Sequence, residues 1–249
     1  MRIMLLGAPG VGKGSQAVLL AKILSIPHIS TGDIFRFHTS KKTELGKQVS
    51  YFIEKGTLVP DDLTMQIVIE RLKQEDCSNG FILDGFPRTI QQAVLFDDAL
   101  NELNIKIDII INIVLNDDSI KKRLTGRLMC PKCTAVYHIE EKVPKYEGLC
   151  DNCYTKLIRR EDDREEIIIK RLQLYHNHIE PILDYYKNKV EVKVVKSKKL
   201  ISETTKDMLY ALGLPVAMVK PDLFKKDLNN EEMLGHIKNQ NESSHFIQV

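Results

Sequence analysis

The stretch that decides the fold is residues 7–15, which read Gly7-Ala8-Pro9-Gly10-Val11-Gly12-Lys13-Gly14-Ser15. An apolar run over residues 2–6 precedes it, and a helical pattern over residues 15–24 follows it. A glycine-rich turn between a strand and a helix predicts a phosphate-binding loop, because glycines let successive backbone N–H groups point at one anion. Lys13 is expected to reach the β- and γ-phosphates, and Ser15 to approach a magnesium ion. An ordinary glycine turn is the alternative, but the Gly-Lys pair and both flanks favour a nucleotide site.

The composition of the 249-residue chain is typical of a soluble globular protein, with 43% hydrophobic and 28% charged residues. Its length allows one large domain, or a core domain with inserts. The net charge of +2 favours neither a nucleic-acid nor a membrane partner, and we expect neither, with the chain a monomer. No apolar run is long enough to cross a bilayer. A strand that begins at residue 2 leaves no room for a signal peptide, which predicts a cytoplasmic protein, with internal targeting left open.

Short apolar runs typical of strands alternate with helical patterns along the chain. The runs cover residues 2–6, 26–29, 80–84, 107–115 and 190–195. This alternation predicts an α/β fold, a parallel sheet of the P-loop NTPase type wrapped by helices. After residue 213 the chain turns polar. We expect residues 214–249 to form an appendage outside the core, with a weak helix over 230–237 and partial disorder at the end.

Three helical predictions bear on the site. Thr31 or Asp33 is expected to cap a helix that runs through Phe37. A second helix is expected over residues 119–128. The longest pattern covers residues 162–186, where Pro181 is expected to bend or interrupt the helix.

Asp84 ends a predicted buried strand and is followed by a Gly-Phe-Pro turn. In doubly wound folds the ligand crevice lies at the carboxyl ends of the strands. Asp84 is therefore predicted to organise magnesium, directly or through water. Capping of the helix that follows is the alternative.

Six arginines lie near predicted turns or on predicted helices. Each alone is most simply a solvated surface residue. With Lys13, however, they place a cation at every candidate ligand-facing turn of a nearly neutral protein, as phosphoryl transfer requires to stabilise charge spread over several oxygens. Arg123 and Arg127 are four residues apart, so we expect both on one helical face. The six are Arg36, Arg88, Arg123, Arg127, Arg160 and Arg171.

Four of the five cysteines form two Cys-x-x-Cys pairs, Cys130 with Cys133 and Cys150 with Cys153. This spacing predicts a tetrahedral zinc site, and four thiolates leave no open position, so the metal is expected to be structural. Chance or redox pairing is the alternative. The segment between the pairs has little apolar material, so zinc is expected to supply its stability. Cys77 is expected to be an unligated thiol.

A different interpretation makes the cysteine pairs a nucleic-acid-binding zinc ribbon attached to an NTPase switch. That function requires a basic face on the zinc segment. The segment instead carries charges of both signs, for example Lys142 and Lys145 against Glu140 and Glu141. The mixed charge counts against nucleic-acid binding.

Taken together, these motifs resemble the adenylate kinase family in its long form with a zinc-bearing lid. The resemblance covers about residues 1–213. The glycine-rich loop matches, with Ser15 where the family has Thr, and the extra Gly14 is normal there. The other matching motifs are Ile29 to Asp33, Leu83 to Thr89, and Asp162 to Glu166.

The resemblance implies reversible, magnesium-dependent phosphoryl transfer from ATP to AMP, which gives two ADP. A GTP:AMP phosphotransferase or another nucleoside monophosphate kinase is the alternative. It also implies two inserts in a core made of residues 1–29, 60–125 and 164–213. Residues 30–59 would bind AMP, and residues 126–163 would form the zinc lid.

The resemblance also assigns residues to each nucleotide. Lys13, Arg88, Arg123, Arg160 and Arg171 would stabilise the transferred phosphoryl group, with Asp84 on magnesium. Residues 197–199 are the candidate contact for the donor base. The acceptor AMP would contact Thr31, Arg36, Thr57, Val59, Gly85, Arg88 and Gln92. The donor would contact Gly10, Val11, Gly12, Lys13, Gly14, Ser15, Arg127, Val136 and Tyr137. Both nucleotides would meet Arg123, Arg160 and Arg171.

Overall fold

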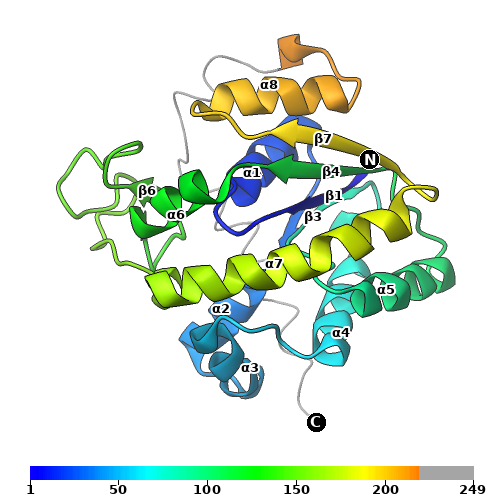
Figure 1. The fold of residues 1–249 in the computed structure, drawn as a ribbon, viewed down its shortest axis with the longest axis horizontal. Coiled ribbons are helices and arrows are strands. Elements are labelled where there is room, and N and C mark those ends of the chain that lie inside the picture. The colour runs from blue at the N-terminus through cyan, green and yellow to red at the C-terminus, as the bar shows by residue number, and fades with distance from the viewer. Residues whose placement is uncertain (219–249) are drawn as a thin grey trace.

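A five-stranded parallel sheet forms the centre of the computed structural model, which describes residues 1–218 (Figure 1). The strand order is β2-β3-β1-β4-β7, and every neighbouring pair is parallel. The predicted α/β fold is therefore confirmed. The strands are β1 (Arg2–Gly7), β2 (His28–Ser30), β3 (Phe81–Asp84), β4 (Ile109–Val114) and β7 (Glu191–Lys196).

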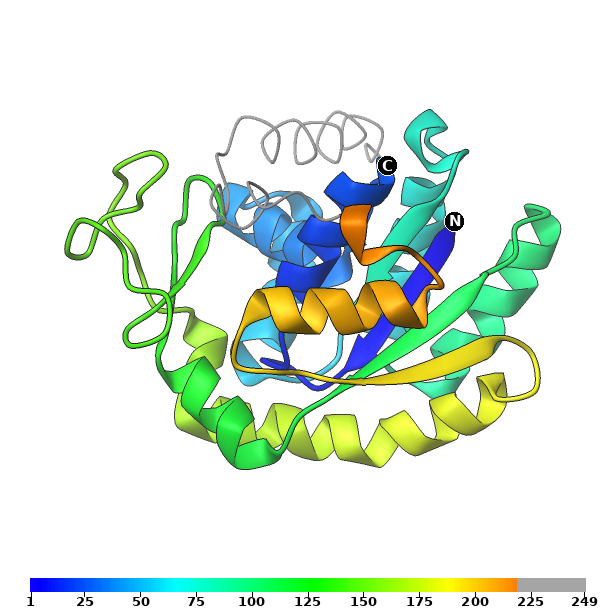
Figure 2. The same ribbon diagram turned by 90° about the horizontal axis from the view of Figure 1, so that it is seen from above.

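Helices cover both faces of this sheet (Figure 2). Side chains alternate along a strand, so Ile3 and Leu5 of β1 pack on one side while Met4 and Leu6 pack on the other. The first side is covered by α1 (Lys13–Leu24) and α8 (Ile201–Ala211). The second is covered by α4 (Asp61–Leu72), α5 (Ile90–Glu102) and α7 (Glu165–Tyr186). Burial on both faces explains the nearly continuous apolar strands.

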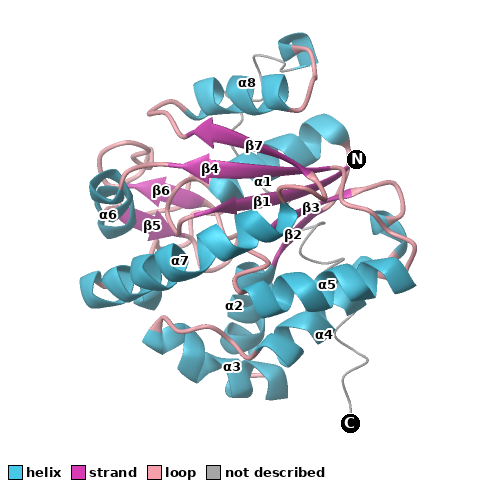
Figure 3. Cartoon of the chain, turned by 45° about the vertical axis from the view of Figure 1, so that its right-hand side comes forward, coloured by secondary structure: helices cyan, strands magenta, loops and turns pink. Residues whose placement is uncertain are grey.

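Two parts of the chain lie outside the sheet and the helices that cover it (Figure 3). Between β2 and α4, the chain forms α2 (Thr31–Lys41) and α3 (Glu44–Lys55). Beyond α6 (Asp117–Thr125), a separate antiparallel sheet pairs β5 (Arg127–Met129) with β6 (Val136–His138). The first part follows the carboxyl end of β2, and the second follows α6, the helix after β4.

Local boundaries correct two of our helical predictions and narrow a third. Ser30, not Thr31 or Asp33, caps α2, since its hydroxyl accepts the Asp33 N–H at 3.3 Å. The long helix begins at Glu165 and not at residue 162, because residues 161–163 form a 3-10 turn. Pro181 lies inside α7, which continues to Tyr186.

The expectation that Arg123 and Arg127 share one helical face is wrong. The helix predicted to run to residue 128 ends at Thr125, and β5 begins at Arg127. Gly126 lies between them, and a Cβ there would come within 2.2 Å of the His138 ring. The two arginines therefore reach the site from different elements.

The chain after α8 forms a short 3-10 turn over Val216–Met218. Residues 219–249, with the helix expected over 230–237, lie outside the described residues. Across residues 1–218 no helix has the length and apolar character needed to span a membrane.

Candidate active site

The glycine-rich loop joins β1 to α1 at the carboxyl edge of the sheet. Gly10 and Gly12 have φ values of 81° and 106°, in the left-handed region that favours glycine. Gly12 is the N-cap of α1, so backbone N–H groups at the helix start remain free for an anion. Lys13 folds back over the loop, and its Nζ donates to the carbonyls of Gly7 at 2.7 Å and Ala8 at 2.9 Å.

Burial, opposed by Asp84 and reinforced by the nearby arginines, lowers the pKa of Lys13 to about 8. The ammonium thus lies in a site that disfavours additional positive charge. A phosphate anion would restore the balance.

A cavity of about 720 Å³ extends from this loop across the carboxyl edge of the sheet. Every predicted nucleotide contact except Val11 lines it. The Val11 side chain is fully buried in the core, and its carbonyl accepts from Arg123 Nη1 at 3.3 Å. The cavity thus joins the loop, the α2–α3 segment and the β5–β6 segment.

Asp84 lies at the end of β3 and is 7% exposed. Its Oδ2 lies 3.3 Å from His28 Nε2, and a Cβ placed on Gly14 would lie 3.5 Å from the same oxygen. The carboxylate therefore faces the phosphate loop. The alternative role is excluded because Thr89 caps α5, its hydroxyl accepting the Gln92 N–H at 3.0 Å.

The six arginines all line the cavity, and carboxylates hold several of them in place. Arg127 donates to both oxygens of Asp163, at 2.7 and 2.5 Å. Arg171 Nη1 lies 2.7 Å from the Asp162 carbonyl and 3.1 Å from its Oδ2. Arg36 donates to Asp33. These bidentate and paired contacts orient planar guanidinium groups before any ligand binds.

Opposing effects act on Asp162. Burial raises the pKa of this carboxyl, but Arg171 and Arg160 outweigh burial and hold the net value at about 2. Burial also acts on Asp33, where Arg36 and Arg160 likewise bring the pKa below its usual range. Both groups are therefore carboxylates at neutral pH.

Arg160 is held less closely by its carboxylate partner. Its side chain is 9% exposed, its Nε has no hydrogen-bond partner, and Asp162 Oδ1 lies 3.6 Å away. Burial, followed by repulsion from Arg36 and Arg127, lowers the pKa of this guanidinium to about 9. A buried cation with an unused donor suits an anionic ligand.

Arg123 joins the loop to the segment after β7. Its Nη1 donates to Ser197 Oγ at 2.8 Å, and its Nη2 donates to the Lys198 carbonyl at 2.8 Å. Residues 197–199, the candidate donor-base contact, also line the cavity. The guanidinium therefore fixes this segment beside the phosphate loop.

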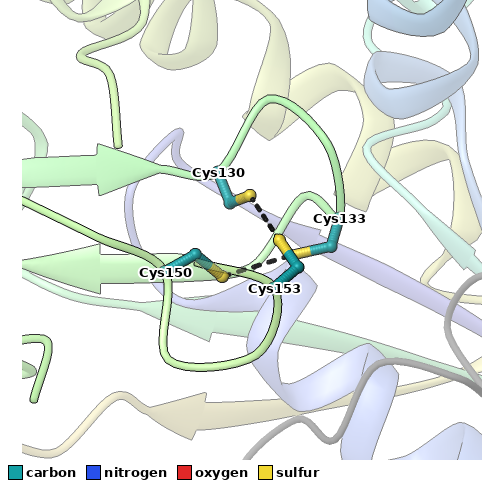
Figure 4. Close-up of side chains that lie close together, drawn as sticks. All are labelled: Cys130, Cys133, Cys150 and Cys153. Carbon is teal, nitrogen blue, oxygen red and sulfur yellow. Dashed lines mark hydrogen bonds between the residues drawn. The ribbon is translucent and has the colours of Figure 1, made fainter. Parts of the chain in front are cut away.

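The four paired cysteines converge in the β5–β6 segment (Figure 4). Their Sγ atoms all lie within 4.8 Å of one another, and Cys130–Cys153 and Cys133–Cys150 are each 3.4 Å apart. Thiolates at Zn–S distances of about 2.3 Å on a tetrahedron are about 3.8 Å apart, so the cluster fits a four-coordinate metal ion. The predicted metal ligands are thus brought together.

Tyr137 belongs partly to this cluster. Its hydroxyl lies 3.5 Å from Cys150 Sγ and accepts the Asp151 N–H at 2.9 Å. The hydroxyl therefore bonds within the segment that carries the four cysteines, although Tyr137 also lines the cavity. Val136, the adjacent residue, also lines it.

Three carboxylates and one imidazole belong to the site although we predicted no chemical role for them. Asp33 was expected only as a cap, and Asp162 and Asp163 only as parts of a motif. Their positions close to arginines in the sequence could have indicated this role, since buried guanidinium groups need carboxylate partners. His28 carried no signal, because Asp84, which it contacts, lies on the neighbouring strand but 56 residues away in the sequence.

Comparison with known proteins agrees with this geometry. Residues 5–191 match the family model described as Adenylate kinase. Adenylate kinase from Acetivibrio thermocellus is 50% identical over 213 residues, covering 86% of this chain and 98% of that protein. The enzyme of the same name from Caldicellulosiruptor bescii is 50% identical over 214 residues, 86% of this chain and 100% of its own. That from Clostridium tetani is 46% identical, with 86% and 99% covered. The chain therefore belongs to the adenylate kinase family and is a nucleoside monophosphate kinase.

Proposed function

We propose that this chain transfers the γ-phosphoryl group of ATP reversibly to AMP, giving two ADP. The observation that carries the proposal is one cavity lined by the phosphate loop, Lys13 and six arginines. So many cations around one space exceed what a single bound triphosphate needs. They suit two nucleotides that meet phosphate to phosphate.

Each nucleotide is assigned to one side of the cavity. The donor lies over residues 10–15, with Arg127 and residues 136–137 above it, and its base lies near residues 197–199. The acceptor lies against Thr31, Arg36, Thr57, Val59, Gly85, Arg88 and Gln92. Residues 30–59 and 126–163 are proposed to close over the two nucleotides as separate inserts, which would exclude water from the reaction.

The chemistry needs placement and charge more than a covalent intermediate. Lys13, Arg88, Arg123, Arg160 and Arg171 would hold the phosphoryl oxygens and stabilise the charge that develops on them. Magnesium, when bound with the nucleotide, would neutralise phosphate charge, and Asp84 with Ser15 offers the oxygen donors that it prefers. The sequence requires no general base.

The metal in the cysteine cluster is proposed to be structural zinc. All four donors are thiols, a set that zinc prefers and that leaves no position for a substrate.

A coupled assay with a panel of donors and acceptors tests the function directly. We expect ATP with AMP to give the highest kcat/KM, ahead of GTP with AMP and of ATP with CMP or UMP. Preferred use of GTP would identify a GTP:AMP phosphotransferase instead. Salt-sensitive binding of DNA or RNA without phosphoryl transfer would support the zinc-ribbon interpretation.

The pKa of Lys13 predicts the alkaline limb of the pH profile. Because its folded value is about 8, the free enzyme loses this positive charge as pH rises through 8. We expect kcat/KM for ATP to fall with an apparent pKa near that value, while kcat falls only at higher pH, because bound phosphate favours the ammonium. A kcat/KM that stays flat to pH 9.5 would contradict a role for the Lys13 charge.

Metal removal is expected to destabilise the β5–β6 segment. Chelation, followed by exchange into magnesium buffer, should lower the Tm by about 5 °C or more. The reason is that a segment of this size with little apolar material depends on its metal for stability. Calorimetry measures the Tm, and elemental analysis measures the metal content. Cys153→Ser should lose the metal, whereas Cys77→Ser, which lies outside the cluster, should retain it. Unchanged melting after complete metal removal would count against a structural site.

A further inference from the structure

The acceptor side of the cavity contains a buried side-chain amide, that of Gln92, which is 1% exposed. Phe35, Leu58 and Val59 line the same cavity. A planar base placed there would therefore meet apolar side chains and this amide, the usual combination in a small-molecule site.

Two hydrogen bonds determine which way the amide faces. The Arg88 backbone N–H donates to Gln92 Oε1 at 2.7 Å, and Gln92 Nε2 donates to Asp61 Oδ1 at 2.7 Å. A backbone N–H can only donate and an ionised carboxylate can only accept. Exchange of the amide oxygen and nitrogen would set donor against donor and acceptor against acceptor, so the orientation follows from the two partners.

Asp61 is itself fixed between two helices. It is the first residue of α4, and its Oδ2 accepts from the Thr89 hydroxyl at 3.0 Å. Thr89 in turn caps α5, the helix that carries Gln92. The carboxylate therefore holds the amide from a neighbouring element and is not part of the cavity lining.

We propose that Asp61 is a positioning residue that sets the base specificity of the acceptor site by fixing the Gln92 amide, an inference that rests on the proposed function. With those two bonds made, the amide keeps one N–H and one oxygen lone pair for a ligand. Adenine offers an N6–H donor beside the N1 acceptor. Hypoxanthine has the same size but offers an O6 acceptor beside an N1–H donor. A fixed amide can pair only with the donor and acceptor arrangement of adenine. A free amide can rotate and pair with either base.

The test compares kcat/KM for AMP and for IMP, with ATP saturating. Wild-type protein should prefer AMP. Asp61→Ala should reduce the AMP:IMP ratio by about tenfold, mainly through a higher KM for AMP, with KM for ATP unchanged. Asp62→Ala is the matched control, because Asp62 lies in the same first turn of α4 and is exposed, so its loss removes the same helix-terminal charge.

Several outcomes would overturn the inference. One is an AMP:IMP ratio that is equal in Asp61→Ala and Asp62→Ala. Another is an equal loss of kcat/KM for both acceptors in Asp61→Ala. A third is wild-type protein that phosphorylates AMP without preferring it to IMP. Wild-type protein that does not phosphorylate AMP contradicts the proposed function instead. If Asp61→Ala does not fold, Asp61→Asn is the deciding variant. The asparagine amide can pair with either orientation of the Gln92 amide, so we expect a smaller fall in the AMP:IMP ratio. An unchanged ratio in Asp61→Asn would then refute the proposal.

Discussion

Replacement of Lys13 by alanine is expected to reduce kcat by about 10³-fold or more. The ammonium lies over the phosphate loop, 2.7 Å from the Gly7 carbonyl, where it can reach the phosphates of a donor. Its charge would act directly on the transferred phosphoryl group. Steady-state kinetics at saturating ATP and AMP measure the loss.

Lys170→Ala controls for the removal of a lysine from this protein. Lys170 is exposed on α7, so its loss should leave kcat within about twofold, as expected of a surface substitution. Lys13→Ala should keep the wild-type Tm or raise it, since burial disfavours the ammonium that it removes. A Lys13→Ala protein that is folded and within tenfold of wild-type kcat would refute the assigned role of the loop.

Replacement of Arg160 by alanine is expected to lower kcat by about 10²-fold or more without lowering the Tm. The reason is that the folded protein disfavours this charge in the absence of ligand. The folded pKa of about 9 is below the ordinary value of a guanidinium, so below pH 9 the group is charged in both states and costs stability only when folded. That cost is relieved as the pH rises above about 9.

Arg159→Ala is the matched control, because Arg159 is the adjacent residue and is exposed. It should keep both kcat and Tm. The opposite pattern for Arg160→Ala, a Tm several degrees lower with kcat retained, would make Arg160 a structural residue. Calorimetry at pH 7 and the coupled assay together separate the two cases.

Local sequence determined the phosphate loop and the metal cluster. Residues 7–15 and the four cysteines each carry their chemistry within a short stretch, where spacing and residue type restrict the geometry. The parallel sheet was also predictable, since buried strands with both faces covered leave continuous apolar runs such as residues 107–115.

The tertiary structure alone decided which charges face one another. Arg123 and Arg127, four residues apart, come from α6 and β5, and the turn at Gly126 between them is tightly packed against His138. Asp61 holds Gln92, and His28 meets Asp84, across many residues of sequence. Such contacts depend on how helices and strands pack, so no local pattern encodes them. The sequence by itself thus predicted a phosphate site and a metal site, and packing decided how the arginines, carboxylates and the Gln92 amide are oriented.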